Sequence, residues 1–168
     1  MSVFNISKNS WYRLMTSSSK QLELSLVGTF PYMSGEKGLV TYGLSNNDIP
    51  SQQWQLFSVD SATFMLRTKA SGPHGYLGIE RLNGSQTTLV PRIYNRTSTD
   101  RSFLWRITPA GDGTFHFSNV ASGNESRLDF SSYEGARMNT NITKPQRGQA
   151  FSFIKVHNID NTRFSSVD

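Results

Sequence analysis

The chain has 168 residues, of which 36% are hydrophobic and 12% aromatic, which suits one domain with a modest core. It has no cysteine, which excludes disulfides and cysteine-ligated metal sites and fits a reducing compartment. The formal net charge is +5, but the basic residues are scattered along the chain, so we expect no specific nucleic-acid site.

The first six residues, Met-Ser-Val-Phe-Asn-Ile, lack a basic start followed by an apolar run, so they do not resemble a secretory signal. No apolar stretch of the sequence is long enough to span a membrane. We therefore expect no membrane insertion and a cytoplasmic location.

Short apolar runs separated by turn residues follow one another along the chain, and this pattern favours strands. In the first fifty residues the runs are 11–15, 22–24 and 39–42, and a polar turn then leads into Gln52-Gln53-Trp54. The same features return with runs at 63–67, 76–79 and 89–94, followed by Phe103-Leu104-Trp105. They return again with 114–118, 128–130 and 136–139, followed by Gln149-Ala150-Phe151. No run of ten or more residues combines helical periodicity with good helix formers, so an all-β chain is predicted.

The spacing of the aromatic residues shows that the chain is a threefold repeat. Trp105 follows Trp54 by 51 residues, and Phe151 follows Trp105 by 46 residues. A period near fifty residues, seen three times, indicates three equivalent units. We place these units at about residues 11–59, 63–110 and 114–157, and residues 158–168 are expected to form an extended or disordered polar tail.

Each unit has four short strands and is too small to bury its own apolar face, so the units must share a core. All-β repeats remove exposed sheet edges by closing a barrel or by forming propeller blades, and three units are too few for a propeller. The prediction is a single β-trefoil domain over residues 1–168, in which Trp54, Trp105 and Phe151 are equivalent core residues.

The repeated Gln-x-Trp motif resembles that of the ricin B-chain lectin family, also called R-type lectins. The resemblance extends from about Trp11 to Val156 and rests on Gln52-x-Trp54, Phe103-x-Trp105 and Gln149-x-Phe151. Single-domain members without cysteine resemble cytoplasmic fungal lectins. The resemblance implies a carbohydrate-binding protein whose partners are glycans or glycoproteins, with a possible homodimer.

The resemblance also implies a sugar site in the third unit. Asp129 stands where the family has the carboxylate that accepts hydrogen bonds from sugar hydroxyls, and Asn139 stands where it has an amide. Asn141 takes the place of the family's aromatic ring. Tyr133, on the loop between Asp129 and Asn139, is expected to stack on the sugar instead. The alternative for Asp129 is a structural role, as a turn cap or an acceptor for backbone N–H groups.

The other two units keep parts of the same pattern. In the second unit, Gly78 replaces the carboxylate, while Tyr94 supplies an aromatic ring and Asn95 an amide. In the first unit we place Glu23 in the carboxylate column, with Tyr42, Asn46 and Asn47 as further binding residues. The alternatives stay open: both tyrosines can be half-buried strand residues, and Asn46 and Asn47 can belong to a plain loop. Gln52 is expected to bond backbone groups and to be structural.

No enzymatic site is indicated. His74, His116 and His157 are isolated, without a partner at metal-ligand spacing, and no nucleophile or phosphate-binding motif is present. We therefore predict no catalysis, no metal and no cofactor. The alternative function is a protein-binding β-trefoil, such as a protease inhibitor that acts through the exposed loop 29–33 or 71–75.

Overall fold

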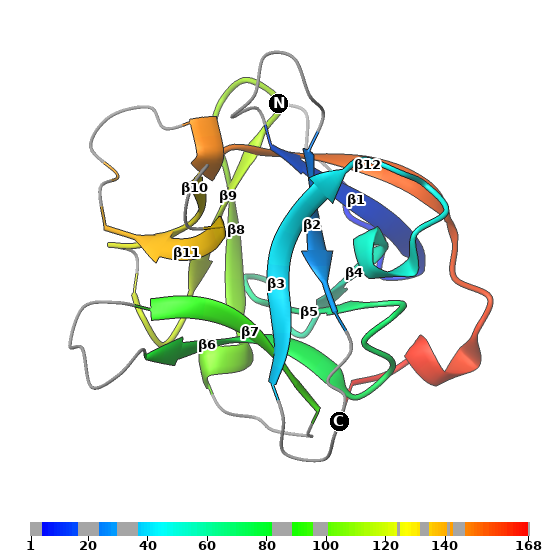
Figure 1. Ribbon diagram of the computed structural model, residues 1–168. Helices are drawn as coiled ribbons and strands as arrows, with labels where there is room; N and C mark the ends of the chain where they lie inside the picture. The colour runs from blue at the N-terminus through cyan, green and yellow to red at the C-terminus, as the bar shows by residue number, and fades with distance from the viewer. Residues whose placement is uncertain are drawn as a thin grey trace.

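The computed structural model describes residues 5–16, 24–29, 37–81, 89–95, 101–123, 125–131, 135–140, 142 and 147–167. These residues form twelve strands, as predicted (Figure 1). The strands are β1 (Ser10–Thr16), β2 (Leu24–Gly28), β3 (Lys37–Leu44), β4 (Trp54–Ser58), β5 (Phe64–Thr68), β6 (Gly75–Arg81), β7 (Leu89–Asn95), β8 (Trp105–Pro109), β9 (Phe115–Asn119), β10 (Arg127–Ser131), β11 (Gly135–Asn139) and β12 (Phe151–Asn158). Short 3-10 helices cover η1 (Pro50–Gln52), η2 (Arg101–Phe103), η3 (Arg147–Gln149) and η4 (Thr162–Phe164). None of the described helices is long and apolar enough to cross a membrane.

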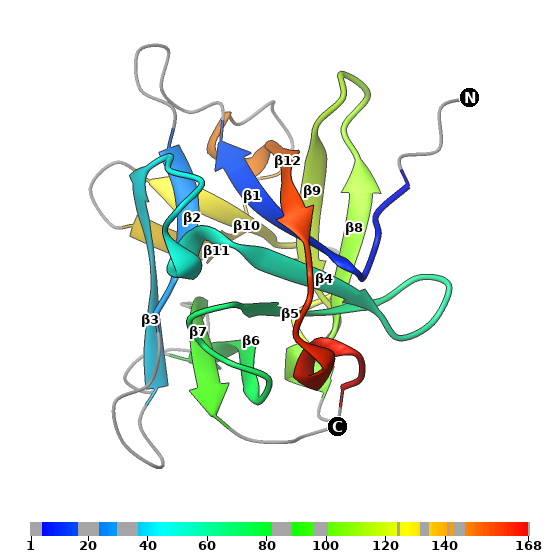
Figure 2. The ribbon, with the colours of Figure 1, turned by 90° about the vertical axis from the view of Figure 1, so that its right-hand side faces the viewer.

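Six strands close into a barrel, in the order β1, β4, β5, β8, β9 and β12, because β12 pairs back onto β1. Within each unit, one equivalent contact connects the first strand to the Gln-x-Trp column of the same unit. These contacts are Tyr12↔Trp54, Phe64↔Trp105 and Phe115↔Phe151. The hairpins β2–β3, β6–β7 and β10–β11 lie together beside the barrel (Figures 1 and 2). The fold is the predicted β-trefoil.

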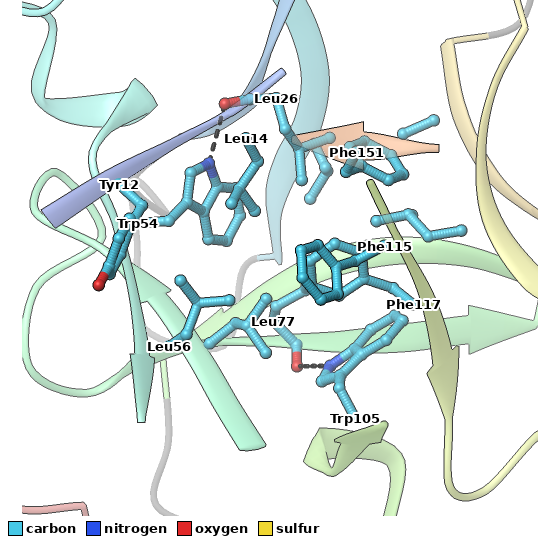
Figure 3. Close-up of a cluster of buried hydrophobic side chains, with 14 of the residues drawn as sticks. Tyr12, Leu14, Leu26, Trp54, Leu56, Leu77, Trp105, Phe115, Phe117 and Phe151 are labelled. Carbon is cyan, nitrogen blue, oxygen red and sulfur yellow. Dashed lines mark hydrogen bonds between the residues drawn. The ribbon is translucent and has the colours of Figure 1, made fainter. Parts of the chain in front are cut away.

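The predicted aromatic column forms the centre of the core. Trp54, Trp105 and Phe151 are all 0% exposed. The indole N–H of Trp54 donates to the carbonyl of Leu26 at 2.8 Å, and that of Trp105 donates to the carbonyl of Leu77 at 3.0 Å (Figure 3). Each indole therefore ties the barrel to the first strand of its own hairpin.

These two hydrogen bonds correct the register that the sequence suggests for the first unit. Leu26, and not Leu22, is the equivalent of Leu77 and Leu128, and all three leucines that share this position are fully buried. The next residue in each unit is therefore Val27, Gly78 or Asp129. The carboxylate column of the first unit thus holds Val27 in place of Glu23, which lies outside the described residues.

Residues 159–167, the C-terminal segment, are packed against the barrel, so the expectation of an extended or disordered tail is wrong for them. The segment begins with a hydrogen bond from the amide of Ile159 to the carbonyl of Asn9, at 2.8 Å. It then forms η4, which Asn161 caps by accepting from the amide of Arg163. Phe164 is 4% exposed, and the two polar ends of the segment therefore flank a buried anchor.

Candidate functional site

Each unit has a cluster of three residues where its hairpin meets the 3-10 helix before the Gln-x-Trp column. We call these the hairpin clusters. In the third unit the cluster is Asp129, Asn139 and Gln149. Asp129 Oδ2 accepts hydrogen bonds from Asn139 Nδ2 at 2.5 Å and from Gln149 Nε2 at 3.3 Å. The third cluster is therefore polar and internally hydrogen-bonded.

The carboxylate of Asp129 lies deep in this cluster, since the residue is only 6% exposed. Its Oδ1 packs directly on the backbone of η3, where a Cβ on Gly148 would come within 2.5 Å of it. The same Cβ would lie still closer to the carbonyl oxygen of Phe130, so the backbone of β10 and the carboxylate together require a glycine at this place. Arg137 stands opposite Asp129 in the β10–β11 register, so the hairpin places a cation beside the acid.

The second hairpin cluster is apolar. Gly78 and Phe103 hold the places of Asp129 and Gln149, and Tyr94 holds that of Asn139. The rings of Tyr94 and Phe103 meet edge to face at 5.5 Å, and a Cβ on Gly78 would lie 3.0 Å from the Phe103 ring. The Phe103 ring therefore fills the space that the polar side chains occupy in the third unit.

The first hairpin cluster consists of Val27, Gly43 and Gln52. The side-chain amide of Gln52 donates to the carbonyl of Leu44, and its oxygen accepts from the amide of Asn46, both at 2.9 Å. Gln52 is thus structural, as the sequence predicts. Its side chain makes hydrogen bonds with backbone groups, whereas that of Gln149 donates to a carboxylate.

The side chain of Tyr42, in β3 of the first unit, contacts the third unit. Its ring centre lies 3.9 Å from that of Phe130, next to Asp129 in the sequence. Burial, and to a lesser extent the negative charge of Asp129, raises the pKa of Tyr42 well above its usual value of 10.0. Its hydroxyl is buried and has no hydrogen-bond partner among the described residues. Tyr42 therefore stays protonated beside the third cluster.

The structure brings some of the predicted site residues together and separates others. Asp129 and Asn139 are in contact, and Tyr42 lies nearby, whereas Tyr94 is packed on Phe103 in the second unit. Asn95 pairs with Gly75 at the end of β7, and its side chain lies outside the described part of the chain. Glu23, Tyr133 and Asn141 also lie outside the described residues. Their roles, like those of the other site residues, stay predictions.

Asn46 and Asn47 lie in the turn before η1. The side chain of Asn46 accepts from the amide of Asp48 at 2.9 Å, and Gln53 Nε2 donates to the carbonyl of Asn47 at 2.6 Å. Both asparagines are exposed. They hold the turn in shape, and no described contact connects them to the third cluster.

Gln149 is the cluster residue that sequence reasoning did not single out for a site. Its motif is the same as that of Gln52, so the two were expected to act alike. The signal that distinguishes them is Asp129, because only the third unit has a carboxylate in the position after the buried leucine. In the described part of the chain, no three His, Cys, Asp or Glu residues gather in a way that could hold a metal ion.

Comparisons with known proteins agree with this fold. The model of the ricin-type beta-trefoil lectin domain-like family matches residues 50–143, which is more than half of the chain. None of the curated proteins matches the chain.

Three solved structures illustrate the structural likeness. The designed threefold-symmetric protein ThreeFoil is 20% identical with a TM-score of 0.64, over 86% of this chain and 97% of that one. The lectin of Polyporus squamosus is 17% identical with a TM-score of 0.63, over 91% of this chain and 50% of that one. An exo-beta-1,3-galactanase from Clostridium thermocellum is 18% identical with a TM-score of 0.67, over 90% of this chain and 31% of that one. At these identities the likeness is one of fold, and it is the family match that shows that this chain belongs to the ricin-type beta-trefoil lectin domain-like family.

Proposed function

We propose that the protein is a glycan-binding lectin in which one of the three repeats has a sugar site, at the third hairpin cluster, and that it binds without catalysis. The observation that carries this proposal is the difference between the three clusters. Asp129, Asn139 and Gln149 form a hydrogen-bonded polar group, whereas Phe103 fills the second cluster and Gln52 bonds the backbone in the first. The family description, which names lectin domains, supports the same conclusion.

The chemistry of the third cluster suits a sugar hydroxyl. A carboxylate has about four lone-pair positions, and Asn139 and Gln149 use two of those on Asp129. Both amides donate to Oδ2, and Oδ1 is proposed to accept from the sugar hydroxyl. The two amides also fix the carboxylate in one orientation, which lowers the entropy lost when a ligand binds. Tyr133 is proposed to supply the stacking ring, and Asn141 a further amide.

The alternative of a protein-binding trefoil has less support. The loop 71–75, one of its two candidates, is not a free protruding loop. The hydroxyl of Ser71 donates to the carbonyl of Gly75 at 2.8 Å, and Arg67 donates to the carbonyl of Pro73 at 2.5 Å. The other candidate loop, 29–33, lies outside the described residues except for Thr29.

The proposal is tested with a glycan array, followed by titration of the best glycan into the parent protein and into the variant Asp129→Ala. Loss of a carboxylate that accepts hydroxyls costs about 1.5–3 kcal/mol, so affinity should fall about tenfold or more. The matched control is Val27→Ala, at the same position of the first unit, and it should bind like the parent. Titration with a neutral glycan should also give one sugar per chain, and a monomer should therefore not agglutinate beads coated with that glycan.

Asp129→Ala also leaves the buried amide of Gln149 and the half-buried amide of Asn139 without their acceptor, so it should lower the melting temperature. Binding is therefore compared at a low temperature at which circular dichroism shows both proteins folded. A parent protein that binds no glycan on the array contradicts the proposal. Undiminished binding by the folded Asp129→Ala protein would instead move the site to another unit.

A further inference from the structure

The C-terminal segment, residues 159–167, is fixed in place by a buried arginine. Arg67 in β5 is 1% exposed, and its guanidinium donates to the carbonyls of Phe164 at 3.0 Å and Ser166 at 2.8 Å. Gln55 in β4 adds a hydrogen bond from Nε2 to the same carbonyl of Phe164, at 2.8 Å. Three hydrogen bonds from barrel side chains thus hold the backbone of this segment.

Aromatic contacts complete the anchor. The guanidinium carbon of Arg67 lies 5.0 Å from the ring centre of Phe164, 5.4 Å from that of Tyr76 and 5.9 Å from that of Phe57. The ring of Phe164 also meets Trp11 edge to face at 4.9 Å. Cation–π and ring contacts of this kind in a buried place stabilise one position of the segment. The surface that the segment presents is therefore rigid.

This rigid segment encloses a pocket with the ends of β1, β5 and β12. The pocket has a volume of about 300 Å³, and its lining includes Trp11, Lys69, His157, Asp160, Asn161 and Phe164. A smaller hollow of about 120 Å³ lies along the same segment, shares Asp160, Asn161 and Phe164 with the larger one, and adds Lys8. Figure 2 shows the segment in red beside the ends of β4 and β5. The pocket belongs to no hairpin cluster, because the segment lies outside the three repeats.

The polar groups of this pocket are available to a ligand. Within the described part of the chain, neither the carboxylate of Asp160 nor the ammonium group of Lys69 has a hydrogen-bond or ion-pair partner. Asn161 uses its side-chain oxygen to accept from the amide of Arg163, which leaves its two N–H donors for other contacts. The pocket therefore offers a ligand the cation of Lys69, the carboxylate of Asp160 and the amide of Asn161, and it is also lined by His157 and Asn158.

The combination of these groups selects a class of ligand. The cation of Lys69 favours an anionic group, while the carboxylate of Asp160 opposes a multiply charged anion such as a phosphate and accepts well from hydroxyls. We propose that this pocket is a second binding site, which takes an acidic sugar residue that carries a single carboxylate. Lys69 pairs with the sugar carboxylate, and Asp160 and Asn161 bond its hydroxyls.

The test compares two sugars that differ only in this carboxylate, methyl β-D-glucuronide and methyl β-D-glucoside, by calorimetric titration of the full-length protein at low ionic strength. The glucuronide should bind about tenfold more tightly, as a charge-assisted hydrogen bond permits. Lys69→Gln should reduce the affinity for the glucuronide to that for the glucoside. Asp160→Asn should weaken binding of the glucoside, since it removes the charge that accepts from hydroxyls. It should weaken the glucuronide less, because it also removes the negative charge that opposes the sugar carboxylate.

Two variants serve as matched controls. Lys155→Gln removes an exposed lysine of β12 that does not line the pocket, so it should keep the preference for the glucuronide. Asp129→Ala alters only the third hairpin cluster and should also keep it, which separates this site from the proposed lectin site. The inference is overturned if the parent does not prefer the glucuronide, if Lys69→Gln behaves like Lys155→Gln, or if Asp129→Ala abolishes the preference.

Discussion

Replacing Trp105 by phenylalanine should destabilise the protein without changing its fold. The indole N–H of Trp105 donates to the carbonyl of Leu77 at 3.0 Å, and the side chain is 0% exposed. The third unit shows that the fold accepts the smaller ring, because Phe151 holds the same column. There the ring meets Phe117 edge to face at 5.3 Å instead of bonding a carbonyl.

The expected cost comes from two sources. Leaving a buried hydrogen-bonding group without its partner costs about 1–3 kcal/mol. The smaller ring also leaves some unfilled volume, although less than the about 3–5 kcal/mol lost when a tryptophan becomes alanine. A total near 2 kcal/mol would lower the melting temperature of a domain of this size by about 4–8 °C. Trp54→Phe should lower the melting temperature by a similar amount, because the indole of Trp54 makes the equivalent hydrogen bond to the carbonyl of Leu26.

The assay is denaturant unfolding followed by far-ultraviolet circular dichroism, since a tryptophan substitution alters fluorescence directly. A control protein with β-(3-benzothienyl)alanine at position 105 keeps the shape of the indole and replaces its N–H by sulfur. This control should lose the part of the free energy of unfolding that the hydrogen bond contributes, about 1–3 kcal/mol. If it is as stable as the parent, the hydrogen bond contributes nothing and the column is held by packing alone.

Two further substitutions test the turns and the core. Asp60 accepts hydrogen bonds from the amides of Ala62 and Thr63, which lower its pKa below the ordinary value of 3.8. The stabilising effect of the Asp60 carboxylate is therefore present above the unfolded-state pKa and is lost as the pH falls through the folded-state pKa. The free energy of unfolding of Asp60→Asn should therefore fall less steeply than that of the parent as the pH is lowered below about 4. Identical acid profiles of the two proteins would contradict this. A Cβ on Gly28 would lie 2.9 Å from the indole of Trp54, so Gly28→Ala should cost about 1–3 kcal/mol in chemical denaturation. Gly43→Ala, whose Cβ would meet nothing closer than 3.4 Å, should cost clearly less, and equal losses would refute the argument from packing.

The fold could be predicted because its strongest signal is long and repeated. Three aromatic residues at intervals near fifty define the units, and each of them is fully buried in the barrel. The exact register in the first unit could not be predicted, because Leu22, Leu24 and Leu26 alternate with the same period of two residues and fit one face equally well. Only the distant hydrogen bond from Trp54 identifies Leu26 as the core residue.

The packed C-terminal segment escaped prediction for a related reason. Its sequence is polar, and a single phenylalanine gives no periodic signal. The groups that hold it, Gln55 and Arg67, lie in strands about a hundred residues earlier and resemble ordinary surface side chains in sequence. The third hairpin cluster was predicted in part, because Asp129 and Asn139 were found by their motif, while the contribution of Gln149 depends on a pairing that only the folded chain shows.

The pairing of β1 with β12 has a consequence for the order in which the chain can fold. Residues 10–16 find their partners among residues 151–158, so β1 cannot complete its pairing until β12 has been synthesised about 140 residues later. Until then β1 has β2 and β4 as neighbours on one side and an open edge on the other, and open strand edges favour aggregation. Closure of the barrel therefore requires that residues 151–158 have been synthesised, and until then the open edge of β1 is exposed to other chains.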